Sequence, residues 1–361
     1  MNQKRLLMIS TDRLIFDEKS EVRARQIEYA KNWDEVHIVV FNRYPRGVSD
    51  ANLKISPNCW IYSTESYSKF LYPFDAIKLG RQIITEHKIS EITCQDSSLT
   101  AMVGVSLKKK FNIPLEIQIH TDIGSPYFAR TITNKIRLMM AKKYLLEADK
   151  IRVVSERIKK YVEVILSNKD CCGDCRCETG NSCKCCGDNC ACDKTLIEVR
   201  PIVVDTEFIK NAPITVDLHK KYPQFTKIVL MASRLEKEKN IELAIRSWSE
   251  IIKINPTVGL IIVGSGSEGS KLKTLISKLG LNKNIFMEKW VDKNILASYY
   301  KTADLFLVTS LFEGYGMTLV EANAVGCKIV STDVGIAKEM NATIVGYNTK
   351  EVADVIVSKI R

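Results

Sequence analysis

A strand–turn–helix unit near the C-terminus constrains the fold of this chain more than any other stretch. The apolar run 304–309 predicts a strand, a turn containing Gly314 and Gly316 follows it, and a helical segment continues to Gly326. In an open parallel sheet this order places the turn at the carboxyl end of a strand, where such sheets bind ligands. Glycines let backbone N–H groups approach an anion, and the helix start adds a dipole that favours phosphate. The unit therefore predicts an α/β domain with a phosphate-binding turn.

Two carboxylates flank this turn and indicate what else binds there. Glu313 lies just before the turn, directly ahead of Gly314, and Glu321 lies two helical turns into the segment that follows. Carboxylates beside bound phosphate would repel it unless they bind something else, and sugar or ribose hydroxyl groups are the natural candidates. The combination suggests a site for a nucleotide sugar.

Three stretches of the second half carry a resemblance to a known family. They are Glu313-x7-Glu321, the segment Ser233-Arg-Leu-Glu-Lys-Glu-Lys-Asn240 after a strand at 228–232, and Gly264-Ser-Gly-Ser-Glu268 after a strand at 258–263. Each motif is weak alone, but the ordered set resembles the retaining glycosyltransferases of family 4. That family has the α/β GT-B fold, in which two Rossmann-like doubly wound parallel-sheet domains face each other across a cleft.

The resemblance also implies a mechanism. The donor would be a nucleoside-diphosphate sugar, a UDP- or GDP-sugar, and transfer would retain the anomeric configuration without any metal cofactor. Arg234 and Lys239 would stabilise the leaving diphosphate electrostatically, Glu313 would hold the transferred sugar, and Glu321 the ribose. The implied donor-binding residues are Ser233, Arg234, Lys239, Gly264, Gly266, Glu313, Gly316, Met317, Thr318 and Glu321, and the implied catalytic residues are His120, Glu313, Arg234 and Lys239.

The first half predicts a second doubly wound sheet, because short apolar strands alternate with helical segments. Expected strands lie at 5–10, 36–41, 59–62, 92–95, 115–120 and 151–155, and those of the second half at 228–232, 258–263, 285–287, 304–309 and 328–332. We therefore expect an N-terminal acceptor domain over residues 1–168, an insertion over 169–194, the end of that domain and a linker over 195–225, and a C-terminal nucleotide-sugar domain over 226–361.

Candidate acceptor residues follow two strands of the first half. His120 lies at the carboxyl end of a predicted strand and is similar to the histidine that lines the sugar site of the family, while Asp122 is as easily structural. The loop after the first strand lacks the glycines that the resemblance would place there. Asp12, Arg13 or Arg23 could instead select the acceptor, a glycan or lipid-linked sugar of the cell envelope or a polysaccharide.

A cysteine-rich stretch breaks the α/β pattern and contains almost no apolar side chain. Its Cys-Cys, Cys-x-Cys and Cys-x-x-Cys spacings resemble a metallothionein domain, whose thiolates would select Zn(II), Cu(I) or Cd(II). A disulfide knot and a reduced, unstructured loop remain the alternatives. The predicted metal ligands are Cys171, Cys172, Cys175, Cys177, Cys183, Cys185, Cys186, Cys190 and Cys192.

Charge and hydropathy bound the partners. The formal net charge of +11 favours anionic partners, but it is spread along the chain and no nucleic-acid motif accompanies it. The amphipathic segment 131–146 could touch an anionic membrane, although Met and Leu at helical spacing more often face a core. With no long apolar run and no leader-like N-terminus, we expect a cytoplasmic protein, peripheral at most on the inner membrane face.

Two other functions stay open at this stage. A nucleotide-sugar epimerase or a phosphorylase could use the same scaffold, because a fold does not fix a function. The chain could also be a metal-binding protein built on a degenerate transferase scaffold. The joint presence of Arg234, Lys239, Glu313 and Glu321 favours sugar transfer.

Overall fold

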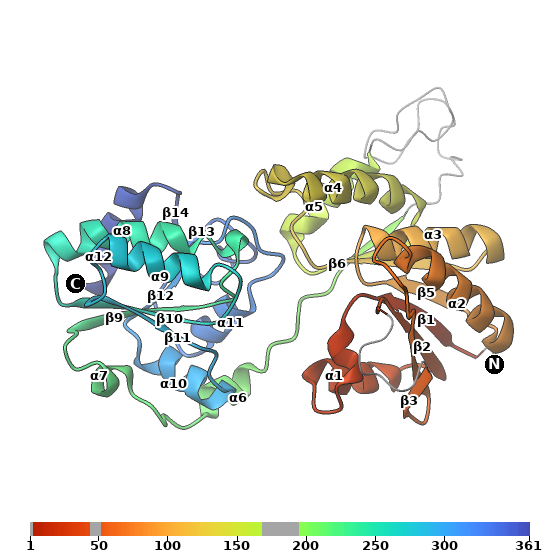
Figure 1. Ribbon diagram of the computed structural model, residues 1–361, viewed down its shortest axis with the longest axis horizontal. Helices are drawn as coiled ribbons and strands as arrows, with labels where there is room; N and C mark the ends of the chain where they lie inside the picture. Colours follow the sequence, from red (N-terminus) through yellow and green to blue (C-terminus); the bar gives the residue numbers. More distant parts are fainter. Residues whose placement is uncertain (1–2, 44–51, 168–194) are drawn as a thin grey trace. The chain divides into compact units, whose positions relative to one another are not determined.

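The computed structural model describes residues 3–43, 52–167 and 195–361, so the predicted cysteine ligands lie outside the described residues. The chain divides into two compact units, Met1–Arg200 and Pro201–Arg361 (Figure 1). Each contains one sheet with helices on both faces, as predicted for a doubly wound architecture. The two units are described separately below.

The first unit is built on an eight-stranded sheet in the order β3-β4-β2-β1-β5-β6-β7-β8. Its strands are β1 Arg5–Ser10, β2 Glu35–Val40, β3 Asn52–Ser56, β4 Cys59–Ser63, β5 Glu91–Cys94, β6 Leu115–Ile119, β7 Lys150–Val153 and β8 Leu196–Val199. The six predicted strands are confirmed within one or two residues at each end, and they pair in parallel. The edge strand β3, which pairs antiparallel with β4, was not predicted.

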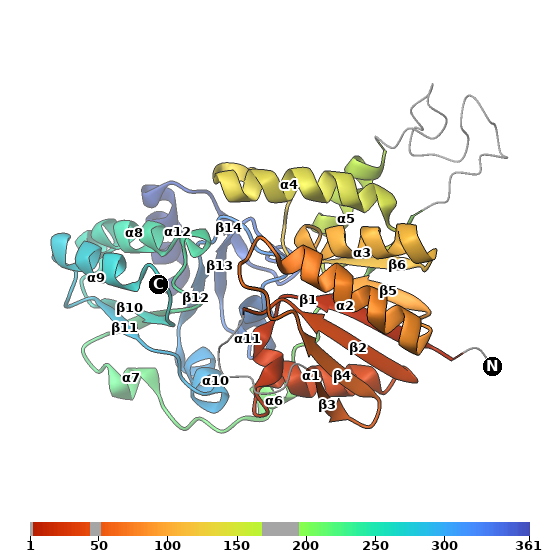
Figure 2. The same ribbon diagram turned by 45° about the vertical axis from the view of Figure 1, so that its right-hand side comes forward.

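Helices cover both faces of this sheet because alternate residues of each strand point to opposite sides. Leu6 and Met8 of β1 pack with Val22 and Tyr29 of α1 on one face, while α2 and α3 contact the strands on the other (Figures 1 and 2). The helical elements are η1 Arg13–Phe16, α1 Glu21–Ala30, α2 Tyr72–His87, α3 Leu99–Phe111, η2 Phe128–Arg130, α4 Ile132–Tyr144, η3 Leu145–Glu147 and α5 Glu156–Leu166.

The second unit contains a six-stranded, fully parallel sheet in the order β11-β10-β9-β12-β13-β14. Its strands are β9 Lys227–Ala232, β10 Val258–Val263, β11 Ile285–Glu288, β12 Leu305–Val308, β13 Ile329–Thr332 and β14 Thr343–Val345. All five predicted strands are present, and β14 was missed because three residues give too short a pattern. The order reverses between β9 and β12, so their carboxyl ends form the point where such sheets bind ligands.

Two cores stabilise this sheet, one on each face. Val229 and Met231 pack under α8, α9 and α12, whereas Leu230 and Phe306 pack against α7, α10 and α11. The helical elements are α6 Thr206–Asn211, α7 Leu218–Lys221, η4 Lys237–Lys239, α8 Ile241–Ile254, α9 Gly269–Lys278, α10 Lys293–Thr302, α11 Met317–Ala324 and α12 Thr349–Ile360.

The segment 195–225, expected to hold the end of the first domain and a linker, divides between the two units. β8 completes the first sheet, and Ile209 and Leu218 are buried in cores of the second unit. The expectation that α4 turns its Met and Leu residues toward a core holds only in part. Leu138 and Met140 are half-buried, but only Ala141 of α4 is fully buried, and the side chain of Met139 is 65% exposed.

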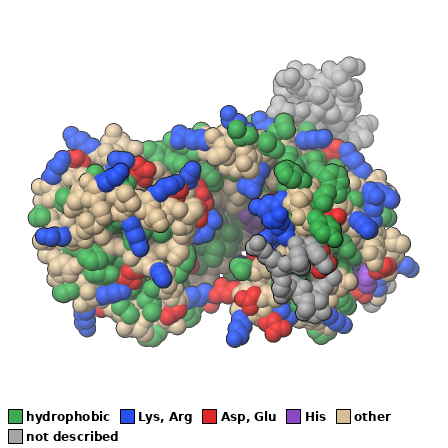
Figure 3. Space-filling model, in the orientation of Figure 1, with side chains coloured by type: hydrophobic (Ala, Val, Ile, Leu, Met, Phe, Trp, Pro, Cys, Tyr) green, Lys and Arg blue, Asp and Glu red, His purple; other side chains and the backbone are tan. Residues whose placement is uncertain are grey.

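Surface properties limit the partners further. Among the helices of the described residues, none is long and apolar enough to cross a bilayer. On the face shown in Figure 3, Lys and Arg side chains are interspersed with Asp and Glu and form no continuous basic stripe. This pattern gives no support to a nucleic-acid groove on that face.

Candidate functional site

The predicted donor motifs meet at the carboxyl ends of β9, β10 and β12 in the second unit. The loop after β9 is joined to the loop after β10 through its backbone, since Leu235 N donates to Ser265 O at 3.0 Å and Ser233 N donates to Val263 O at 3.1 Å. Gly264 has a φ of +152°, and a Cβ there would lie 1.9 Å from Ser233 O. Only glycine fits this approach, so the structure gives Gly264 a packing role that the motif alone did not reveal.

A buried ion pair lies at the centre of these loops. Lys239 Nζ is 2.5 Å from Glu313 Oε1, and both side chains are less than one-fifth exposed. Ser310 Oγ donates to the same oxygen at 2.8 Å. Two residues that are 74 positions apart in the sequence are thus brought together, as the motifs predicted. A cation and a hydroxyl-accepting carboxylate therefore share one site.

Arg234 lies differently from Lys239. Its side chain is 63% exposed, and Nη2 is 3.1 Å from Oε1 of Glu238, one helical turn further along the loop. The two predicted cations therefore pair with different carboxylates in this structure. Glu238 connects this loop to the β12 loop as well, because its carbonyl oxygen accepts from Leu311 N at 2.7 Å.

The start of α11 supplies backbone donors beside the ion pair. Gly316 is its N-cap, with a φ of +98° that an L side chain rarely adopts. Met317 and Thr318 form the first turn. The first N–H groups of an α-helix have no acceptor within the helix and are aligned with its positive dipole end. This turn has the geometry expected of an anion-binding helix start.

Glu321 lies in α11, and a residue of the neighbouring helix α10 holds its side chain by a hydrogen bond. Tyr300 Oη donates to Glu321 Oε2 at 2.7 Å. Burial raises the pKa of Glu321 above its usual value, while the hydrogen bond from Tyr300 opposes the shift. Because a carboxylate has about four acceptor positions, Glu321 can accept from a ligand hydroxyl as well as from Tyr300. Tyr300 was not predicted, and its aromatic side chain in a helix gave no signal beyond core packing.

We expect Glu321→Gln to raise the free energy of unfolding near neutral pH. A carboxyl whose pKa is higher in the folded than in the unfolded protein loses stability as pH rises above its unfolded value of 4.5, because folding then opposes ionisation. The amide keeps an acceptor for Tyr300 and carries no charge. Urea unfolding of both proteins at about pH 4 and about pH 7 checks this. A variant less stable than the parent at the higher pH contradicts the expectation.

Two further residues hold the β12 loop in place and were missed. The Tyr347 hydroxyl donates to Ser310 O at 3.2 Å, and Thr332 Oγ1 donates to the same carbonyl at 2.6 Å. Thr309 Oγ1 donates to Asn240 O at 3.0 Å and so joins this loop to the start of α8. Their roles depend on contacts between residues far apart in the sequence, which a local sequence motif does not indicate.

In the first unit, His120 lies at the carboxyl end of β6, as predicted. Its Nε2 is 3.2 Å from Gln118 Oε1, which also accepts from Arg152 Nη2. Although His120 is partly exposed to solvent, desolvation of its ring and then the positive charge of Arg152 lower its pKa to about 4. The imidazole is therefore neutral near pH 7. Asp122 is buried and accepts from Gly124 N at 3.2 Å, which is a structural role in the turn.

The three candidate acceptor residues after β1 differ in how they are held. Asp12 caps η1 by accepting from Leu14 N, and Arg13 donates from Nη2 to the Tyr72 hydroxyl at 2.7 Å. Arg23 is only 9% exposed, and its charged partner is Glu18 at 3.7 Å. This nitrogen, Nη1, is buried and makes no hydrogen bond within the described residues, and the contact with Glu18 is too long to be one. Nη1 can therefore still donate to an anionic ligand.

Residues 218–361 match the model of the family Glycosyl transferases group 1. Among curated relatives, the poly(glycerol-phosphate) alpha-glucosyltransferase of Bacillus subtilis is 30% identical over 139 residues, which is 37% of this chain and 20% of the relative. Alignments with three such relatives cover between 20% and 63% of the relatives' own length, so the chain matches only part of each.

Solved structures show the fold over the whole chain. Sucrose-phosphate synthase from Thermosynechococcus elongatus superposes with a TM-score of 0.75 at 19% identity, covering 99% of this chain and 89% of that one. Anabaena HepE in complex with UDP and glucose superposes with a TM-score of 0.68 at 17% identity, covering 99% and 90%. The chain therefore has the GT-B fold that the sequence motifs implied.

Proposed function

We propose that this chain, whose residues 218–361 match the model of the group 1 glycosyl transferases, transfers a sugar from a nucleoside-diphosphate sugar with retention of configuration. The observation that carries the proposal is the Lys239–Glu313 pair beside the start of α11. It places a cation, backbone N–H donors and a carboxylate together at the carboxyl ends of β9 and β12. A diphosphate and a sugar need these groups side by side.

The residues would divide the donor between them. Lys239 and the first N–H groups of α11, at Met317 and Thr318, would stabilise charge on the leaving diphosphate. Such electrostatic stabilisation of the transition state is usually the largest contribution to enzyme catalysis. Glu313 would accept from hydroxyls of the transferred sugar, and Glu321 from those of the ribose. Arg234, exposed and held only by Glu238, would turn toward the phosphates when the donor binds.

The acceptor side would be formed by the first unit. The neutral His120 is suited to hydrogen bonding with a sugar hydroxyl rather than to an ionic contact. Arg23 would bind an anionic group of the acceptor through Nη1, which lies 3.7 Å from Glu18 but makes no hydrogen bond within the described residues. A lipid-linked, cell-envelope or polysaccharide acceptor that carries phosphate fits this pair. Contact of α4 with an anionic membrane stays a prediction, consistent with the exposed side chains of Ile132 and Met139.

We expect Arg23→Met to weaken binding of an anionic acceptor without changing donor affinity. A hydrogen bond to a charged group contributes about 1.5–3 kcal/mol, so the acceptor Kd should rise by about 10-fold or more. Poly(glycerol phosphate) serves as the anionic probe in a binding titration. Arg25→Met, an exposed arginine of the same helix, is the matched control. Equal loss in both variants, or no loss in either, rejects a specific role for Arg23.

Ligand-observed binding across UDP-, GDP- and ADP-sugars tests the proposed function as a whole. Saturable binding of one donor, followed by transfer to a glycan or lipid-linked acceptor with retained configuration, supports it. Folded protein that binds no donor in the panel rejects it, and leaves the alternative of a metal-binding protein on a degenerate scaffold. The thiolate cluster of residues 171–192 lies outside the described residues and stays a prediction.

A further inference from the structure

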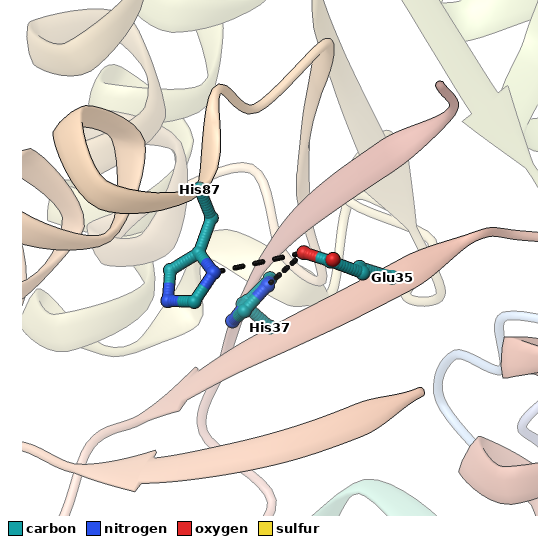
Figure 4. A group of neighbouring side chains, drawn as sticks. All are labelled: Glu35, His37 and His87. Atoms are coloured by element: carbon teal, nitrogen blue, oxygen red, sulfur yellow. Dashed lines mark hydrogen bonds and ion pairs between the residues drawn. The ribbon is translucent and has the colours of Figure 1, made fainter. Parts of the chain in front are cut away.

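Three potential metal ligands come together at one edge of the first unit (Figure 4). Glu35 begins β2, His37 lies two residues on and therefore points to the same face, and His87 is the last residue of α2. Glu35 Oε2 is 3.3 Å from His37 Nε2 and 3.6 Å from His87 Nδ1. The three ligand atoms all lie within 4.8 Å of one another.

These separations fit a tetrahedral zinc ion. With bonds of about 2.0–2.1 Å, the edge of a tetrahedron between two ligand atoms is about 3.4 Å. The two measured distances bracket that value, so a metal could bind both histidines and the carboxylate with small side-chain shifts. Two imidazole nitrogens and one carboxylate oxygen, with the fourth position left for water, are a common ligand set for Zn²⁺. Mg²⁺ prefers octahedral oxygen ligands and would not suit this set.

The surrounding side chains orient the histidines for this role. His37 is fully buried, and its Nδ1 is 2.9 Å from the Tyr62 hydroxyl, which leaves Nε2 directed at Glu35. The ring stacks on Trp60 with centroids 5.0 Å apart and planes at 6°. Such outer contacts fix the tautomer of metal-ligating histidines.

One cation lies beside the three ligands. Arg5 Nε is 3.4 Å from Glu35 Oε2 and makes no hydrogen bond within the described residues, while Arg5 Nη1 donates to His87 O at 2.8 Å. Arg5 therefore pairs with Glu35 and holds the end of α2, and the two imidazole rings pack with centroids 4.1 Å apart. Glu86 lies 4.0 Å from Nε2 of His87 and supplies a carboxylate behind this ligand.

We propose that Glu35, His37 and His87 bind a structural Zn²⁺ ion that ties the end of α2 to the start of β2. The site lies at the amino ends of the parallel strands, whereas His120 lies at the carboxyl end of β6, so the ion takes no part in sugar transfer. Its three ligands are not among the predicted cysteine ligands. Its effect is on stability, because an ion that binds only the folded chain raises Tm.

A zinc titration of the full chain, with accessible thiols first blocked by N-ethylmaleimide, tests the proposal. We expect about one Zn²⁺ per chain and a Tm rise of about 5–10 °C at zinc concentrations near 100 times Kd. Both should be lost in His87→Gln and in Glu35→Gln. His219→Gln should keep them, because His219 is a comparably exposed histidine that faces Asp304 in the second unit.

Two results overturn the proposal. One is that the thiol-blocked parent binds no Zn²⁺, and the other is that His87→Gln and Glu35→Gln bind it as the parent does. A Co²⁺ spectrum of the parent gives a test that does not depend on how well the variants fold. Tetrahedral nitrogen and oxygen ligation gives visible ligand-field bands without thiolate charge transfer, and absence of those bands also rejects the site.

Discussion

Lys239→Ala is expected to lower kcat/KM for sugar transfer by about 100-fold or more, the usual result of removing one charge-stabilising donor. The side chain is 14% exposed, and its ammonium group is the partner of Glu313. Without this ammonium group, the negative charge that develops on the diphosphate is no longer stabilised by the cation of Lys239. The carboxylate of Glu313 then also faces the phosphates uncompensated, which adds repulsion. Steady-state kinetics and donor Kd measured with the donor selected by the binding panel check this expectation.

Lys237→Ala is the matched control for this experiment. Lys237 belongs to the same short helix η4, but its side chain is exposed rather than paired with Glu313. We expect its kcat/KM to stay close to that of the parent. A Lys239→Ala protein that folds and transfers sugar as fast as Lys237→Ala would remove the central support for the proposed function.

The parallel strands of both units could be predicted because buried strands are short, apolar and β-branched, and all the predicted ones are present. What failed was the assignment of segments whose environment decides their role. Residues 201–225 look like a linker, yet the apolar side chains of Ile209 and Leu218 pack on the second sheet. Met139 has the spacing of a core residue, yet nothing in the described part of the chain covers it.

In the candidate site too, local motifs predicted some residues and could not predict others. Local motifs identified Lys239, Glu313 and Glu321, because a loop after a strand displays its polar residues at one edge of the sheet. They could not distinguish the half-buried Lys239 from the exposed Arg234, since Lys239 pairs with Glu313 of the distant β12 loop whereas Arg234 pairs with Glu238 of its own loop. Tyr300 and Tyr347 could not be found at all, because their hydroxyl groups act across the fold.

Gly264→Ala is expected to destabilise the second unit by about 2–4 kcal/mol and to weaken donor binding by more than about 10-fold. The new methyl group would lie 1.9 Å from Ser233 O, a backbone atom that cannot rotate away, and φ of +152° adds strain. Relief requires the β9 and β10 loops to separate, which moves η4 and Lys239 with them. Urea unfolding and donor titration measure the two effects.

Gly269→Ala makes the same chemical change five residues later and serves as the control for Gly264→Ala. It shows whether the effect comes from backbone strain at Gly264 or from any added methyl group in this region. A Cβ at Gly269 would meet Leu235 Cδ1 at 3.4 Å, an ordinary contact, and the residue begins α9 without a positive φ. We expect its stability to stay within about 0.5 kcal/mol of the parent. If Gly264→Ala also stays within that margin and binds the donor normally, the two loops are not held together by this contact. The position of Lys239 must then depend on its pairing with Glu313 and on the β12 loop alone.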